Sequence, residues 1–314
     1  MSSLPTIDEA LALVLEWVRP LAGEDVPVAR AAGRVVTEPA LAVTDLPPFD
    51  SSAMDGYAVR AADTPGKLTV VGHSAAGRPE TRELGVGEAI VISTGAVVPD
   101  GADAVVPVER TSGDVTVEGV SPGENIRPRG GDTRTGDVIV ERGDLLRPAQ
   151  LGALAAAGVP TVYCARRPRV AVLATGSELR APGEMLAPGE IYESNTVLLG
   201  AQLESAGAEV TVLPSVRDEE AATRAALERG LEYDVLVTSG GVSVGPHDLV
   251  RGALAELGVD EIFWRVAVRP GKPIAFGVGR ETLVFGLPGN PVSSLVAFEL
   301  FVRPALLALQ GARE

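Results

Sequence analysis

The chain has 314 residues, enough for two or three domains, and its 46% hydrophobic residues and 36 glycines fit a globular protein with many turns. No apolar run comes near the roughly 20 residues that cross a bilayer, the N-terminus lacks a signal peptide, and a net charge of −15 argues against a nucleic-acid-binding surface. One cysteine excludes an internal disulfide, and two histidines leave little for a histidine-based metal site. We therefore expect a cytoplasmic protein whose partners include neither a membrane nor a nucleic acid.

Two helices are predicted in the first half of the chain. Residues 7–19 form one, because Thr6 and Glu9 make a capping box and apolar residues then recur at helical spacing. Residues 148–159 return to helical texture and end at a glycine. We expect the second helix to pack back on the first, which predicts a discontinuous helical linker domain made of residues 1–46 and 141–168.

A β-rich domain is predicted between these two parts, over residues 47–140. Short segments rich in β-branched residues alternate there with Gly, Pro and Asp turns, which is typical of a compact β domain. The predicted strands are 68–71, 89–92, 104–108, 115–117 and 138–140.

Strand and helix alternate regularly from residue 169 to the end. The predicted strands are 170–174, 209–213, 234–238, 262–268 and 282–286. The predicted helices are 195–206, 218–230, 247–257 and 291–309, the last interrupted at Pro304. Such alternation predicts a doubly wound α/β domain over residues 169–314, with a mostly parallel sheet and helices on both faces. In sheets of this kind ligands bind outside the C-terminal ends of the strands.

The most informative segment of the α/β half is residues 234–258. An apolar run stops at a glycine-rich turn that leads into a helix, and free N–H groups at such a turn suit a phosphate. Asp248 lies in the first helical turn, where a bare carboxylate would repel phosphate, so we expect a divalent metal between them. Taken alone, the segment is equally well interpreted as an ordinary turn with an acid that stabilises the helix dipole.

Other segments should meet this turn at the same rim of the sheet. Residues 175–178, 215–218 and 286–291 each follow a predicted strand, and the second carries Asp218. Together with phosphate-binding turns, acids at the rim favour Mg²⁺-assisted phosphoanhydride chemistry, although each acid alone has a structural explanation. Lys272 is one of only two lysines and lies in a rigid turn. A lysine at this position, in a chain that otherwise uses arginine, suggests a need for a compact ammonium group; chance is the competing explanation.

Familiar nucleotide motifs are absent, since the sequence contains neither G-x-G-x-x-G nor a P-loop. No nucleophile-elbow motif occurs either.

In the β-rich half, residues 51–58, 92–96 and 130–132 form turns that carry a hydroxyl or an acid. Composition alone favours a structural interpretation of these turns.

Seven motifs together resemble the MoeA family of molybdopterin molybdenumtransferases, to which the gephyrin E domain is related. They span most of the chain and are specific only as a set. The motifs are PPFDSSAMDGYA (47–58), ISTGAVVPDGADAVV (92–106), RPRGGD (127–132), LATGSEL (173–179), TSGGVSVGPHD (238–248), RPGKP (269–273) and GLPGNPVS (286–293).

This resemblance implies an enzyme that inserts molybdenum from molybdate into adenylylated molybdopterin, needs a divalent cation such as Mg²⁺, and releases AMP. It also implies an elongated homodimer whose site is shared between the α/β domain of one subunit and the β domain of the other. Asp55, Thr94 and Asp132 would come from the second subunit. Other proteins of molybdenum cofactor biosynthesis are possible further partners.

Site residues are assigned by motif match. The predicted catalytic residues are Asp55, Asp132, Glu178, Asp218, Asp248 and Lys272. The predicted metal ligands are Asp218 and Asp248. The residues predicted to bind the pterin intermediate, its phosphate or molybdate are Thr94, Thr175, Gly176, Ser239, Gly240, Gly241, Ser243, Gly245, Arg265, Arg269, Pro288, Gly289, Asn290 and Pro291.

The sequence departs from the family pattern in two places. Arg265 and Arg269 stand where the family often has lysine, which keeps the charge but changes its geometry. The family also usually continues into a small C-terminal β domain, which is expected to be missing because the sequence ends four residues after Gln310. A pterin carrier, a scaffold without metal-insertion activity and a molybdopterin adenylyltransferase are the alternatives.

Overall fold

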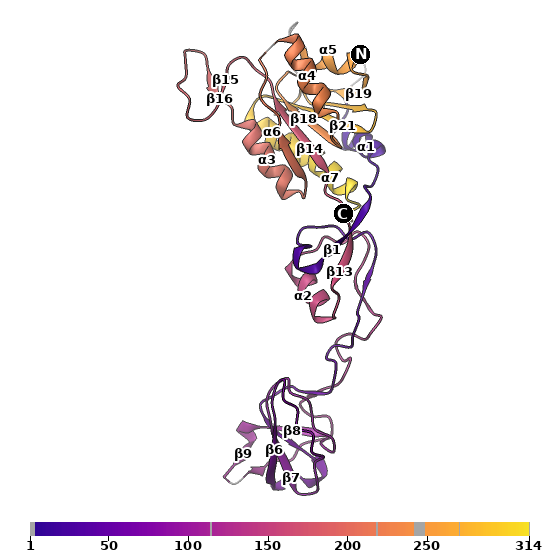
Figure 1. The fold of residues 1–314 in the computed structure, drawn as a ribbon, viewed down its shortest axis with the longest axis vertical. Helices are drawn as coiled ribbons and strands as arrows, with labels where there is room; N and C mark the ends of the chain where they lie inside the picture. Colours follow the sequence, from indigo (N-terminus) through magenta and orange to yellow (C-terminus); the bar gives the residue numbers. More distant parts are fainter. Residues whose placement is uncertain (1–3, 114, 218, 242–248, 270, 314) are drawn as a thin grey trace. The chain divides into compact units, whose positions relative to one another are not determined.

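The structure is a computed structural model that describes residues 4–113, 115–217, 219–241, 249–269 and 271–313. The chain divides into two compact units (Figure 1). The first comprises Met1–Glu38, Glu141–Arg147 and Thr161–Glu314, and the second comprises Pro39–Val140 and Pro148–Pro160.

A six-stranded sheet forms the centre of the first unit, which confirms the predicted α/β domain. Its order is β17 (Glu209–Val212), β14 (Arg169–Ala174), β18 (Val235–Ser239), β21 (Thr282–Leu287), β20 (Ala275–Gly279) and β19 (Val259–Trp264). The first four strands are parallel, whereas β20 and β19 add antiparallel pairs, so the sheet is mixed.

The predicted strand over 262–268 is wrong in its bounds, and β20 was not predicted. The sequence of β20, AFGVG, contains two glycines, which weaken a strand signal. The packing of β20 against β19 explains Gly277. A Cβ on this residue would lie 2.9 Å from a methyl carbon of Val259 and 3.0 Å from the Asp260 carbonyl oxygen. Close approach of β19 therefore requires glycine where the sequence pattern argued against a strand.

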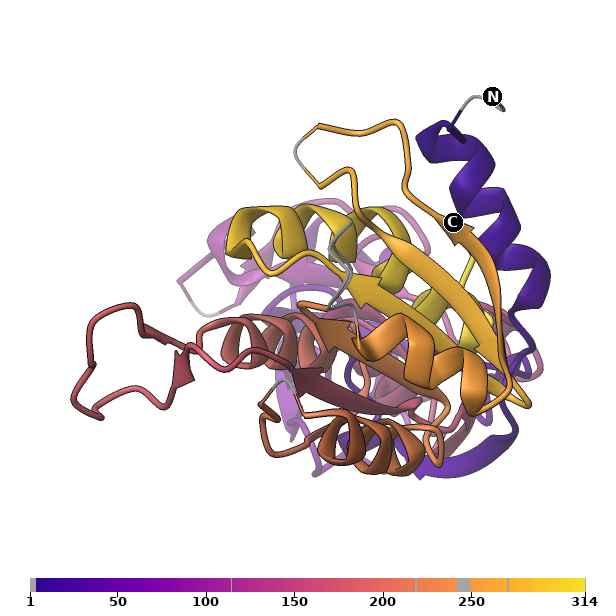
Figure 2. The same cartoon turned by 90° about the horizontal axis from the view of Figure 1, so that it is seen from above.

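Helices cover both faces of this sheet, as predicted (Figure 2). One face carries α1 (Ile7–Trp17), α3 (Asn195–Ser205), α6 (Pro291–Ala297), the π-helical turn η4 (Phe298–Val302) and α7 (Arg303–Leu309). The other face carries α4 (Glu220–Gly230) and α5 (Leu249–Glu256). The predicted interruption at Pro304 corresponds to the π-helical turn η4, which directly precedes α7, and the proline occupies one of the first two positions of α7.

The continuous helical run of α6, η4 and α7, over Pro291–Leu309, is long and apolar enough to cross a membrane by length and composition. Half of it is buried, and Phe298, Phe301 and Leu306 belong to the core beneath the sheet. Its apolar character is therefore explained by packing inside the α/β unit.

The second unit contains the predicted β-rich segment, residues 47–140, together with residues 39–46 and 148–160. Its main sheet has the order β6 (Thr69–Ser74), β7 (Glu88–Ile92), β4 (Gly56–Val59) and β8 (Ala104–Pro107). Smaller sheets pair β5 (Gly66–Lys67), β10 (Thr116–Val117) and β9 (Thr111–Ser112), then β11 (Ile126–Arg127) with β3 (Ser51–Ser52), and β12 (Val138–Val140) with β2 (Ala40–Leu41). Single 3₁₀ turns occupy Ala61–Asp63 and Val108–Arg110 in this unit, and Val28–Arg30 in the first unit.

The segments predicted to form a linker domain are divided between the two units. In the first unit, β1 (Gly23–Pro27) pairs with β13 (Thr161–Ala165), and α1 contributes Ala10 and Val14 to the core under the sheet. In the second unit, α2 (Pro148–Ala156) contacts β12. A separate linker domain therefore stays a prediction.

Candidate functional site

Three turns meet at the C-terminal ends of three adjacent parallel strands, β14, β18 and β21. They begin at Thr175, Gly240 and Pro288. The Thr175 N–H donates to the Ser239 carbonyl at 3.1 Å, and the Gly240 N–H donates to the Leu287 carbonyl at 3.1 Å. Each of these bonds joins the first residue of a turn to the last residue of the neighbouring strand. The three turns therefore lie side by side at one edge of the sheet, as predicted.

Two glycines make the central turn possible. Gly240 and Gly241 have φ values of +89° and +68°, which side chains rarely adopt. A Cβ on Gly240 would lie 2.7 Å from the Thr175 carbonyl oxygen, and one on Gly241 would lie 2.4 Å from a methyl carbon of Val250. The backbone of this turn is therefore packed tightly between β14 and α5, and its conformation depends on glycine.

Glu178 lies at the same rim, on the turn after β14. Its carboxylate is folded against Gly176, since a Cβ there would meet a carboxylate oxygen of Glu178 at 2.7 Å. The Gly176 N–H donates to the Val216 carbonyl at 3.2 Å, which brings the predicted 215–218 turn to the same place. The side chain of Glu178 is exposed.

An arm follows Glu178 and projects from the rest of the α/β domain (Figures 1 and 2). At its base β15 (Leu179–Arg180) pairs in parallel with β16 (Ile191–Tyr192). Arg180 forms an ion pair with Glu190. A hydrogen bond from the Ala187 N–H and the nearby Arg180 guanidinium hold the pKa of Glu190 below its usual value. The arm thus has a fixed base beside the Glu178 turn.

The third turn leads into the N-terminus of α6. The side chain of Asn290 caps this helix, because its oxygen accepts from the Val292 N–H at 3.0 Å and the Ser293 N–H at 3.3 Å. Pro291 follows in the first turn, as predicted. The Ser294 hydroxyl donates to the Pro288 carbonyl and closes the turn. A second helix N-terminus therefore lies beside the glycine turn, and its first N–H groups are satisfied by the Asn290 cap.

The loop between β19 and β20 brings cations to this helix. The Val266 N–H donates to the Lys272 carbonyl at 3.1 Å, and a Cβ on Gly271 would lie 3.7 Å from Ser293, in the first turn of α6. The side chains of Arg269 and Lys272 are exposed. The loop thus presents two positive charges to solvent close to a helix N-terminus.

Arg265 is held differently from these two residues. Its backbone lies in the left-handed region, with φ at +77°, a strained conformation for a residue with a side chain. Its guanidinium lies 3.9 Å from the centre of the Trp264 ring, and that of Arg251 lies 4.1 Å from the same ring. A cation–π contact thus fixes the first arginine of the loop.

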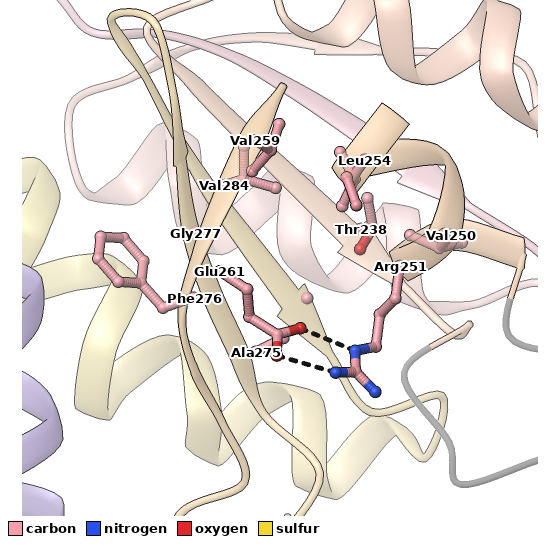
Figure 3. A pocket seen from close by; sticks show the side chains of 13 residues that line it. Thr238, Val250, Arg251, Leu254, Val259, Glu261, Ala275, Phe276, Gly277 and Val284 are labelled. Carbon is pink, nitrogen blue, oxygen red and sulfur yellow. Dashed lines mark hydrogen bonds and ion pairs between the residues drawn. The ribbon is translucent and has the colours of Figure 1, made fainter. Parts of the chain in front are cut away.

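A cavity of about 460 Å³ lies between α5 and strands β18, β21, β20 and β19 (Figure 3). Its lining is mainly apolar, and Arg251 and Glu261 are joined there by two hydrogen bonds of 2.8 Å. Thr238, fully buried and two residues before Gly240, faces this space, and its hydroxyl has no hydrogen-bond partner among the described residues. The cavity was not predicted, because five separate elements of the chain form it.

In the β-rich unit, the predicted residues gather around β3. The Thr94 N–H donates to the Asp55 carboxylate at 2.7 Å, and the Gly95 N–H donates to the Ser52 carbonyl at 2.8 Å. On the other side of β3, Arg127 pairs with Ser51 in the sheet and forms an ion pair with Asp132. The three turns that composition alone assigned to structure are therefore neighbours.

One acid near these turns has a strongly altered pKa. Asp45 accepts hydrogen bonds from the Thr135 N–H at 2.9 Å and from Arg129 at 2.6 Å, which lower its pKa to about 2. The Arg129 N–H also donates to Asp50 at 2.7 Å. These bonds fix the loop that carries Asp132.

Four predicted site residues lie outside the described residues. They are Asp218, Ser243, Gly245 and Asp248. Across the part of the chain that the structure describes, no three His, Cys, Asp or Glu side chains are grouped closely enough to hold a metal ion. Glu178 therefore does not form a metal site with described residues alone.

Comparison with known proteins accounts for both units. Residues 5–158 match the MoeA N-terminal region (domain I and II), and residues 171–308 match a probable molybdopterin binding domain. Molybdopterin molybdenumtransferase 2 of Mycobacterium tuberculosis H37Rv is 40% identical over 325 residues, covering 98% of this chain and 80% of the relative. Molybdopterin molybdenumtransferase of Haemophilus influenzae is 40% identical over 318 residues, covering 98% and 78%.

A solved structure agrees with these relatives. The molybdopterin biosynthesis MoeA protein from Pyrococcus horikoshii OT3 matches with a TM-score of 0.80 and 32% identity, covering 99% of this chain and 81% of that one. The chain belongs to the MoeA family of molybdopterin molybdenumtransferases, which are enzymes of molybdenum cofactor biosynthesis.

Proposed function

We propose that this chain inserts molybdenum from molybdate into adenylylated molybdopterin and releases AMP. The observation that carries the proposal is the convergence of the turns at Thr175, Gly240 and Pro288 on one rim of the sheet. N–H groups of the glycine turn would bind a phosphate of the anhydride. Lys272 and Arg269 would neutralise molybdate or the departing phosphate, and Glu178 would orient the pterin or move a proton.

A Mg²⁺ requirement is part of the proposal. Asp218 and Asp248, both outside the described residues, would hold the ion, which would polarise the anhydride when bound. The described residues do not form a metal site by themselves.

The substrate and the products are tested by AMP release from adenylylated molybdopterin in the presence of Mg²⁺, with and without molybdate. We expect molybdate-dependent release together with the formation of active cofactor, and loss of release when Mg²⁺ is chelated. Tight binding of the intermediate without release would contradict the proposal and favour a pterin carrier or scaffold. Consumption of ATP instead would favour an adenylyltransferase.

We also propose a homodimer in which Asp55, Thr94 and Asp132 of one subunit complete the α/β turns of the other. Asp55→Asn and Lys272→Met chains should each keep no more than about 1% of wild-type activity. If the two residues act from different subunits, each mixed dimer keeps one intact site, so an equal mixture should recover about a quarter of wild-type activity. Absence of recovery after subunit exchange, shown by mixed dimers of differently tagged chains, would place both residues in one subunit. A cytoplasmic location, a linker domain and further protein partners stay predictions.

A further inference from the structure

A buried asparagine joins two of the turns at the rim. Asn195, the first residue of α3, is 8% exposed, and its amide nitrogen donates to the Ser239 hydroxyl and to the Gly289 carbonyl, both at 2.7 Å. These partners lie 44 and 94 residues away in the sequence. The carbonyl can only accept, so the nitrogen of the amide must face it, and the orientation of the side chain is fixed.

The surroundings prevent this side chain from swinging away. Glu193 is also 8% exposed, and its carboxylate accepts from the Thr196 N–H at 2.9 Å and from the Thr196 hydroxyl. These bonds lock the backbone on both sides of Asn195. The amide oxygen of Asn195 is buried and has no partner among the described residues. Burying an acceptor without a partner costs free energy, and the two hydrogen bonds that the amide nitrogen donates offset this cost.

The bond to Ser239 has a consequence for the hydroxyl hydrogen. Because the Ser239 oxygen accepts from Asn195, its own hydrogen must point elsewhere. Ser239 is 2% exposed, and no hydrogen bond donated by its hydroxyl is found among the described residues. Gly240 follows directly, and a Cβ on Gly289 would lie 3.9 Å from its Cα. An unused donor therefore lies where the glycine turn and the Gly289 turn come together.

We propose that Asn195 is a positioning residue of the anion site. It holds the Gly289 turn beside Gly240, and it orients the Ser239 hydroxyl to donate to a phosphate bound at the glycine turn. A hydrogen bond to a charged oxygen is about twice as strong as a neutral one. This inference rests on the proposed function, because it takes the glycine turn as the place where the phosphoanhydride binds.

The test is a double-mutant cycle on the binding of inorganic pyrophosphate, measured by calorimetry with the full chain. Asn195→Ala and Ser239→Ala should each weaken binding about tenfold. The double variant should be no weaker than the single ones, because the hydroxyl acts only when the amide orients it. If Asn195 did not act through Ser239, the losses of affinity in the two single variants would multiply in the double variant.

A second variant covers the case in which Asn195→Ala fails to fold. Asn195→Asp keeps the size of the side chain but removes the donors, so the Ser239 hydroxyl would donate to the new carboxylate. Binding should weaken at least as much as in Ser239→Ala, because the carboxylate also repels the anion. The matched control is Gln202→Ala, which removes an exposed amide bond to Glu299 from the same helix and should leave binding unchanged.

Three results would overturn the inference: full affinity in Asn195→Asp, multiplying effects in the cycle, or no pyrophosphate binding by the wild-type chain. Pyrophosphate binding does not require molybdenum insertion. A chain that passes this test but releases no AMP would therefore lose the proposed function and keep the role of Asn195.

Discussion

Replacing Lys272 with methionine is expected to lower kcat/KM for molybdate-dependent AMP release about 100- to 1,000-fold, the usual loss when one donor to a developing negative charge is removed. The backbone of Lys272 closes its loop, since its carbonyl accepts from the Val266 and Ile274 N–H groups, both at 3.1 Å. Its side chain is exposed. The loop should therefore keep its shape, and the thermal unfolding temperature should stay unchanged.

The chain offers a matched control for this variant. Lys67, the only other lysine, lies in β5 of the β-rich unit, and Lys67→Met should keep full activity. Lys272→Arg should fall between wild type and methionine, because a guanidinium keeps the charge but spreads it over a planar fork. A Lys272→Met chain with normal kcat/KM would remove this residue from the mechanism.

Local signals predicted much of the α/β domain. The alternation of apolar runs with amphipathic segments predicted β14, β17, β18 and β21 to within a residue or two. Asn290 and Pro291 marked the start of α6 because a cap and an N-terminal proline act on neighbouring residues. In contrast, β20 was missed because its glycines serve contacts with β19, which the sequence around β20 does not show.

The site was predictable in its motifs but not in its connections. Sequence placed Thr175, Gly240 and Gly289 at strand ends, and the parallel sheet brings them together as expected. Asn195 was missed, since an asparagine at the start of a helix reads as a local cap, whereas its bonds reach two distant turns. In the β-rich unit, the bond from Thr94 to Asp55 spans 39 residues, so composition could not distinguish these turns from ordinary ones.

Phe285→Ala is expected to have the largest effect on stability, lowering the free energy of unfolding of the α/β unit by about 3–5 kcal/mol. Phe285 lies in β21, is fully buried, and its ring centre is 5.0 Å from that of Phe276 in the core under the sheet. Both tryptophans of the chain, Trp17 and Trp264, belong to this unit, so their fluorescence during denaturation should report its unfolding. Phe49→Ala, at a 38% exposed position in the other unit, should change this transition by less than about 0.5 kcal/mol.

Phe285→Ala should lower the free energy of unfolding but leave kcat/KM of the folded enzyme nearly unchanged. Lys272→Met should do the reverse. The turn after β21 is fixed by the backbone bond from Gly240 to Leu287 and by the Asn290 cap, neither of which involves the Phe285 side chain. At temperatures where the variant is folded, kcat/KM per folded molecule should therefore stay within about threefold of wild type, less than 1 kcal/mol of transition-state stabilisation. A large fall in kcat/KM in the fully folded variant would show that core packing under β21, and not only the backbone, positions the anion turn.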